Sequence, residues 1–196
     1  MQHVGIGRAH IVGHSSSGNV ALQLALDAPE CVQSLAMLEP ALMTVPSVVT
    51  SRAAIVEAAQ RYKAGDSIGA IHSFLKCVCG PDYRRALDRV LPGGFDQYVA
   101  DAPAFFEQEF PALQQWSFGR DTARRITQPV LAVVGERSLS YDPIWGERHQ
   151  LLLDWLTDVE AFVLPGAGHL LQIENPASLA AALANFFARH GSVAPV

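Results

Sequence analysis

The stretch Ile11-Val12-Gly13-His14-Ser15-Ser16-Ser17-Gly18-Asn19-Val20-Ala21 joins a short apolar run to a helix-like segment through small residues. Residues 8 to 13 have β-branched side chains at their centre and stop at a glycine, which is typical of a strand. Residues 18 to 28 are apolar nearly all round a helical wheel, and such a helix must be buried on several faces. The stretch therefore predicts a strand, a tight turn at Ser15 and a buried helix.

The residue types around Ser15 favour a reactive role for its hydroxyl. Small residues stand two positions away on either side, Gly13 and Ser17, as a tight strand-to-helix turn requires. Such a turn strains the serine backbone, exposes the hydroxyl at the carboxyl edge of the sheet and points the Ser16 N–H into the same space. The alternatives are a serine-rich helix cap or a phosphate-binding loop. A phosphate loop would carry more glycine and a lysine, so we interpret Ser15 as a nucleophile.

Outward from this turn, the chain alternates between strands and helices. Residues 32 to 38 form a second buried strand, so the first forty residues predict a βαβ unit and a parallel sheet. The same rhythm returns with strands at 130–134 and 159–164 and helices at 145–156 and 176–189. We expect an α/β fold in which residues 1–40 and 129–196 form a mostly parallel sheet flanked by helices.

The middle of the chain has a different pattern. Residues 41–128 show helical spacing of apolar residues and no strand pattern, so we expect a helical insertion between two strands of the sheet. Within it, residues 95 to 118 are helical but interrupted by Pro103 and Pro111, and they are rich in aromatic side chains. Those expected to contact a substrate are Phe105, Phe106, Phe110 and Trp116; the alternative is that they form the insertion's own core.

Composition argues against several classes of protein. The 196 residues are 49% hydrophobic and 17% charged, which suits a globular chain with a large core and not a disordered or fibrous one. A net charge of −5 argues against nucleic-acid and anionic membrane partners. No apolar run is long enough for a membrane helix, and the first residues do not resemble a signal peptide. Three cysteines without metal-ligand spacing predict a cytoplasmic protein without a metal site.

A second motif, Gly166-Ala167-Gly168-His169, follows the last predicted strand. An imidazole that leaves the end of a parallel strand can lean over the sheet edge toward Ser15. A lone histidine is more often a surface or core residue, but His169 follows the serine in the order that a serine–acid–histidine site uses. The two motifs together therefore predict a nucleophile and its general base.

With these segments, and with Pro129-Val130-Leu131-Ala132-Val133-Val134-Gly135-Glu136, the chain resembles the α/β-hydrolase superfamily. The resemblance implies that residues 41–128 are the cap, or lid, that this family carries between its sixth and seventh strands. It also implies catalysis without a metal or organic cofactor on a small-molecule substrate. The sequence leaves the oligomeric state open.

The carboxylate that orients His169 remains open at this point. The family often has an aspartate shortly after the Gly-Glu that ends the seventh strand, and here that position is Ser138. Glu39, which ends the preceding strand, is the favoured substitute because an ionised carboxylate there is costly unless it is paired. Asp142 is the alternative acid, although it can instead cap the following helix, and Glu136 is a third candidate.

The readable strands correspond to the last four of about eight in the family, so we expect an incomplete reading frame, a mis-assigned start or a fragment. The strand at 8–13 should be central, and nothing in the chain can pair with its far side. Of the two usual oxyanion donors, the sequence supplies the Ser16 N–H.

The expected activity is that of a serine hydrolase on ester-type bonds of a small, apolar substrate. Alternatives are C–C bond hydrolysis or cofactor-free peroxidation on the same residues, or a non-catalytic or truncated ligand-binding relative.

Overall fold

The computed structural model describes residue 3 and residues 5–191. Its centre is a parallel sheet with the strand order β1-β2-β3-β4. The strands are β1 (Ala9–His14), β2 (Val32–Leu38), β3 (Val130–Gly135) and β4 (Val159–Leu164). Because the strands are parallel, all four carboxyl ends lie at one edge of the sheet, where ligands bind in open α/β sheets.

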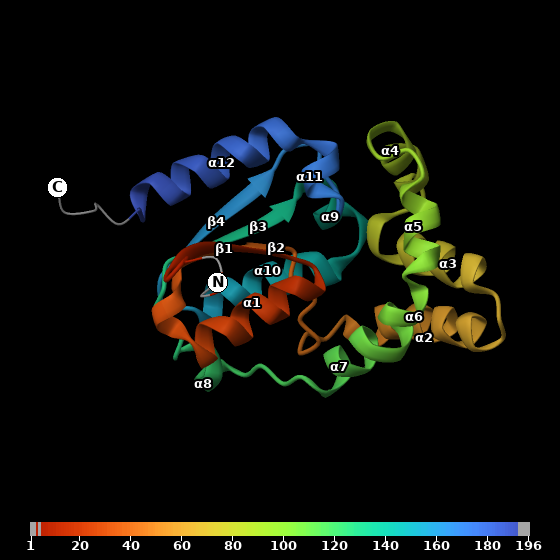
Figure 1. The fold of residues 1–196 in the computed structure, drawn as a ribbon, viewed down its shortest axis with the longest axis horizontal. Helices are drawn as coiled ribbons and strands as arrows, with labels where there is room; N and C mark the ends of the chain where they lie inside the picture. The colour runs from red at the N-terminus through yellow and green to blue at the C-terminus, as the bar shows by residue number, and fades with distance from the viewer. Residues whose placement is uncertain (1–2, 4, 192–196) are drawn as a thin grey trace.

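Helices cover both faces of this sheet (Figure 1). They are α1 (Ser16–Asp27), α9 (Glu136–Tyr141), α10 (Pro143–Trp155), α11 (Leu171–Glu174) and α12 (Pro176–Arg189), and a 3₁₀ turn at Pro29–Cys31 precedes β2. Along β3, alternate residues point to opposite sides. Val130, Ala132 and Val134 pack with α1 and α10, whereas Leu131 and Val133 pack with α12. A strand buried on both faces reads as a continuous apolar run, which the sequence shows.

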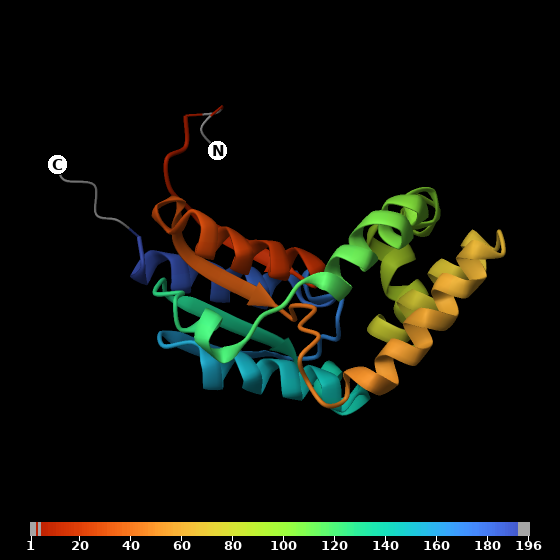
Figure 2. The ribbon, with the colours of Figure 1, turned by 90° about the horizontal axis from the view of Figure 1, so that it is seen from below.

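All the regular secondary structure between β2 and β3 is helical. Its helices are α2 (Val48–Lys63), α3 (Ser67–Cys79), α4 (Tyr83–Val90), α5 (Gly94–Ala100), α6 (Ala102–Ala104), a π-helical segment (Phe105–Glu109), α7 (Phe110–Gln115) and α8 (Arg120–Ala123). Helices α2 to α7, here called the inserted helices, stand beyond the carboxyl ends of the strands in both views (Figures 1 and 2). They pack around their own apolar cluster, which includes Ile71, Leu75, Tyr83 and Leu87.

The expected α/β class is confirmed, and the element boundaries agree closely with the sequence. Strands β2 and β4 and helix α12 have their predicted limits, and Asp66 caps α3 by accepting from the Gly69 N–H. Helix α4 has no counterpart among the predicted helices, because its eight residues are too few to show a clear apolar period. Pro103 and Pro111 interrupt the helical run less than expected, since each lies in the first turn of its helix, where no N–H is needed.

β1 is one of the two edge strands of the sheet. It pairs with β2, and among the described residues no strand lies on its other side. Apolar side chains are exposed beside this edge: Val12 of β1 and Val20 of α1 both lie at the surface. None of the helices in the described part of the chain is long and apolar enough to cross a membrane.

Close packing of α1 on the sheet depends on glycine at position 13. A Cβ built at Gly13 would lie 2.7 Å from the Gly18 Cα and 2.8 Å from the Ser17 carbonyl oxygen. Both neighbours are backbone atoms, so the helix itself would have to move.

We expect Gly13→Ala to lower the free energy of unfolding by about 1–3 kcal/mol through overpacking. The control is Gly119→Ala, because a Cβ at Gly119 meets nothing within 4 Å and its φ is −117°. Urea denaturation of both variants measures the difference. Equal stability of the two variants would show that the turn has more room than its geometry indicates.

Candidate active site

Ser15 lies in the turn between β1 and α1 with a strained backbone. Its φ of 54° and ψ of −127° place it outside the regions that L-residues normally occupy. Three hydrogen bonds hold it there. The Ser15 N–H donates to the Leu38 carbonyl at 3.0 Å, and its own carbonyl accepts from the N–H groups of Gly18 and Ala41. The end of β2 and the start of α1 therefore maintain the strain, as such conformations require.

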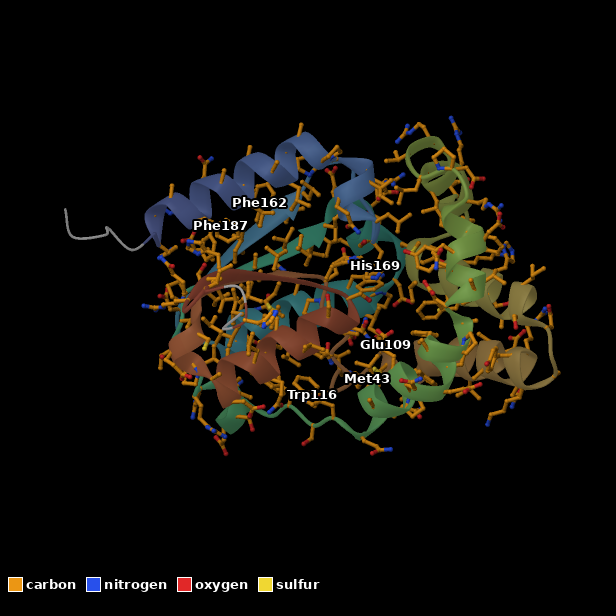
Figure 3. The ribbon with its side chains drawn as sticks, viewed as in Figure 1. Met43, Glu109, Trp116, Phe162, His169 and Phe187 are labelled. Atoms are coloured by element: carbon orange, nitrogen blue, oxygen red, sulfur yellow. The ribbon has the colours of Figure 1, made fainter. Side chains whose placement is uncertain are left out.

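His169 lies in the loop after β4 and faces both Ser15 and Glu39. Its Nε2 is 3.2 Å from the Ser15 Oγ, and its Nδ1 is 2.7 Å from Glu39 Oε2. Figure 3 shows His169 between the sheet and the inserted helices. Because the carboxylate accepts a hydrogen bond from Nδ1–H, Nε2 is left with a lone pair for the serine hydroxyl.

Glu39 is a buried carboxylate directly after β2, and it also has a left-handed backbone, with φ at 45°. Its Oε1 accepts from the Gly135 N–H at 2.8 Å, which ties the end of β2 to the end of β3. Burial raises the pKa of this carboxyl, but hydrogen bonds from His169 and Gly135 outweigh it and hold the pKa below its ordinary value. Glu39 is therefore ionised at neutral pH.

The other two candidate acids have different partners. Asp142 accepts from the Ile144 N–H at 2.9 Å and caps α10, and Glu136 accepts from the Gly166 N–H at 2.8 Å. Among the described residues, the one carboxylate that hydrogen-bonds His169 is Glu39. Ser138 is buried near the Glu39 carboxylate, without a well-formed hydrogen bond of its own.

Two aromatic rings pack against the His169 imidazole. The Trp145 ring is stacked on it at 4.4 Å between centroids, and the His14 ring lies at 4.7 Å. His14 Nε2 donates to the His169 carbonyl at 2.8 Å. Burial, together with the neighbouring His169, lowers the pKa of His14 to about 4, so this ring is neutral. The contact with Trp145 was not predicted, because a tryptophan on an apolar helix reads as a core residue.

A cavity of about 480 Å³ lies over Ser15 and His169, between the sheet edge and the inserted helices. This volume suits a small molecule. Apolar side chains from α3 and the segment around the π-helix make up much of its wall, including Ile71, Phe74, Leu75, Val78, Phe105 and Phe110.

Two of the four aromatic residues expected at the substrate lie elsewhere. Phe106 stacks on Tyr62 at 5.0 Å within the core of the inserted helices. Trp116 donates its Nε1–H to the Gln23 Oε1 of α1 at 2.9 Å and stacks on Phe118. Neither ring lines this cavity, whereas Phe105 and Phe110 do. Adjacent residues on a helix point in different directions, and sequence spacing alone did not show which faced the cavity.

The first turn of α1 begins with Ser16, whose N–H has no partner within the helix, as is usual for this position. Its hydroxyl donates to the carboxylate of Glu109, which the π-helical segment carries to the rim of the same cavity. Figure 3 shows Glu109 on the side of the inserted helices that faces the sheet edge. The sequence contained no signal for this contact, which joins residues 93 positions apart.

Cys77 and Cys79 of α3 also line the cavity, as free thiols. Burial raises the pKa of both. Both therefore remain protonated at neutral pH and are weak nucleophiles beside Ser15.

A family model described as the alpha/beta hydrolase fold matches residues 1–176. The match covers most of the chain, and the protein belongs to the α/β-hydrolase family.

Individual relatives agree at low identity. An uncharacterised carboxylesterase of Bacillus subtilis is 24% identical over 94% of this chain. The structure of naproxen esterase from the same species aligns with 95% of the chain at a TM-score of 0.69 and 24% identity. A thermophilic esterase from Thermogutta terrifontis aligns with 97% of the chain and 69% of its own at a TM-score of 0.78 and 17% identity. The chain spans 58% of the curated carboxylesterase and 62% of the naproxen esterase chain.

The neutral state of His14 predicts how stability depends on pH. Its pKa is about 4 in the folded protein and near 6.5 when unfolded, so the unfolded chain binds an additional proton between these values. Stability therefore falls as the pH drops from 6.5 to 4, by at most about 3 kcal/mol from this residue. In His14→Gln, we expect a flatter dependence of the melting temperature over this range.

The pH dependence that remains in the variant comes from other groups whose pKa values are also lower in the folded protein. They include His10 and His149, whose pKa values burial lowers. An unchanged slope in His14→Gln would contradict the assignment of a buried neutral ring at this position.

Proposed function

We propose that this chain carries the catalytic site of a serine carboxylesterase, with Ser15 as nucleophile, His169 as general base and Glu39 as the orienting acid. The observation that supports it most is the continuous hydrogen-bonded series from Glu39 through His169 to the Ser15 hydroxyl. Such a series lowers the cost of removing the serine proton and stabilises the imidazolium that results. The names of the relatives, an uncharacterised carboxylesterase and two esterases, favour an ester as the substrate.

In the proposed reaction the Ser15 oxygen attacks the ester carbonyl as its proton passes to His169 Nε2. The negative charge that develops on the carbonyl oxygen is stabilised by the Ser16 N–H at the start of α1. His169 then gives the proton to the leaving alcohol, and an acyl-enzyme remains. Water, activated by the same imidazole, releases the acid and restores Ser15.

The inserted helices, within residues 41–128, are proposed to act as a cap over this site. Their apolar side chains would hold the non-reacting part of a small ester and reduce access of water to the developing charge. The hydrogen bond between Glu109 and Ser16 supports a closed position, because it joins the π-helical segment to the turn that carries the nucleophile.

The nucleophile can be tested with a fluorophosphonate probe followed by mass spectrometry of the labelled peptide. We expect stoichiometric labelling of Ser15 and its loss in Ser15→Ala. Ser140→Ala, an exposed serine of α9, is the matched control and should be labelled as the unmodified protein is. A folded protein that takes up no label would favour the non-catalytic alternative for this chain.

The acid can be tested by comparing Glu39→Gln with Asp142→Asn. Loss of the charge that orients His169 should lower kcat by on the order of 10³-fold in Glu39→Gln, and by far less in Asp142→Asn. Ser138 is buried near Glu39, so Glu39→Gln combined with Ser138→Asp should recover part of the loss. A larger loss in Asp142→Asn would assign the acid to Asp142 instead.

A further inference from the structure

Arg148 of α10 is buried in the wall of the same cavity. Only 7% of it is exposed, and it lines the cavity together with Ser15 and His169. Of the described residues that line this cavity, Arg148 is the one lysine or arginine. A buried guanidinium is costly unless it is paired, so its partners decide what it does.

Several N–H groups of Arg148 have no hydrogen-bond acceptor in the described part of the protein. Its Nε–H donates to the Leu42 carbonyl at 2.9 Å, and its Nη2 lies 3.9 Å from the sulfur of Met43, which is a weak acceptor. In the described part of the chain, no carboxylate lies within 4.0 Å of it, and Nη1 donates no hydrogen bond to the protein. Nη1 is also absent from the fully enclosed atoms without a partner, so it keeps some accessible surface, and the residue lines the cavity.

Nearby groups fix the position of this cation without neutralising it. The guanidinium carbon lies 5.1 Å from the centroid of the Trp145 ring, in a cation–π contact. Glu39 and Asp142 act on it from a greater distance, but Glu39 binds His169 and Asp142 caps α10. Burial lowers the pKa of Arg148 to about 10, which still leaves it charged at neutral pH.

We propose that Arg148 binds a carboxylate group of the substrate, so that the preferred substrates are esters that carry a second, ionised carboxyl group. This inference rests on the proposed esterase function and names its substrate class. A planar guanidinium matches a carboxylate through two parallel hydrogen bonds. The apolar side chains that line the same cavity suit a short hydrocarbon linker. Half-esters of small dicarboxylic acids combine these features.

The competing interpretation is that Arg148 is a structural residue. It holds the Leu42 carbonyl in the segment that follows Glu39, and it stacks on Trp145, which stacks on His169. A purely structural role would affect all esters alike, whereas a binding role affects only those with a negative charge.

The first measurement needs no variant. We compare kcat/KM for mono-4-nitrophenyl esters of succinate, glutarate and adipate with that for 4-nitrophenyl esters of unsubstituted acids of the same chain length. We expect at least one anionic ester to be preferred by about 10-fold or more, with an optimum in linker length. A preference for the neutral ester at every length would overturn the proposal.

The second measurement uses Arg148→Met, which keeps an apolar stem of similar length, and Arg148→Lys, which keeps the charge but not the planar group. On the preferred anionic ester, we expect kcat/KM of Arg148→Met to fall by about 10- to 100-fold, mainly through KM, with an intermediate loss in Arg148→Lys. On the neutral ester the loss should be several-fold smaller, because there only the contacts with Leu42 and Trp145 are removed. An equal loss on both esters would assign Arg148 the structural role.

A third measurement separates this inference from the esterase proposal, because it needs no turnover. Ser15→Ala is titrated calorimetrically with glutarate and with the uncharged glutaramide. We expect Ser15→Ala to bind glutarate but not glutaramide. We expect the double variant Ser15→Ala/Arg148→Met to bind neither. If the phosphonate probe fails but glutarate binding depends on Arg148, the anion site stands and the esterase proposal falls. If esters are hydrolysed and glutarate does not bind, the anion site falls alone.

Discussion

The hydrogen bond between Glu39 and His169 is the constraint on which the geometry of the site depends. It spans the carboxyl edge of the sheet, from the end of β2 to the loop after β4, and the Gly135 N–H at the end of β3 binds the other carboxylate oxygen. One ionised side chain thus ties three strand ends together. It also fixes the imidazole so that Nε2 faces Ser15, which a freely rotating ring would not maintain.

The backbone around this interaction is arranged to make it possible. Glu39 and Ser15 are the two non-glycine residues with positive φ among those described, and each directly follows one of two neighbouring strands at the same edge. Ser15 is held by a hydrogen bond to Leu38, the residue before Glu39. At Gly135 a Cβ would come within 2.4 Å of the Ala167 carbonyl oxygen, so the loop that carries His169 can approach β3 only because that position is glycine. Strain and close approach therefore gather where the chemistry is proposed to occur.

The electrostatics of the cavity follow from the same arrangement. The Glu39 carboxylate is hydrogen-bonded to His169, so its negative charge is directed at the imidazole and not at the cavity. His14 is neutral, and the thiols of Cys77 and Cys79 are protonated. Arg148 remains as a buried cation that the protein does not pair directly. Of the other acidic side chains that line the cavity, Asp101 and Glu109 are exposed and Asp142 caps α10. An anionic group that reaches the interior would find its favourable contact at Arg148.

The sequence alone determined the α/β class, the order of strands and helices, and the positions of Ser15 and His169 in turns after β1 and β4. These features depend on local patterns, namely apolar runs, glycines and prolines, and the rule that parallel strands share a carboxyl edge. The sequence left the acid open among Glu39, Asp142 and Glu136. It also did not separate the aromatic residues that line the cavity from those that do not, because both outcomes depend on where side chains point. Only the tertiary structure decided that Glu39 reaches His169, that Asp142 caps α10 instead, and that Arg148 faces the cavity. Glu39 and His169 are 130 positions apart, and a side chain's direction toward a cavity depends on packing, so local spacing encodes neither. The Asp142 cap is a local contact that the sequence allowed, but only its pairing with Ile144 decided between the two roles.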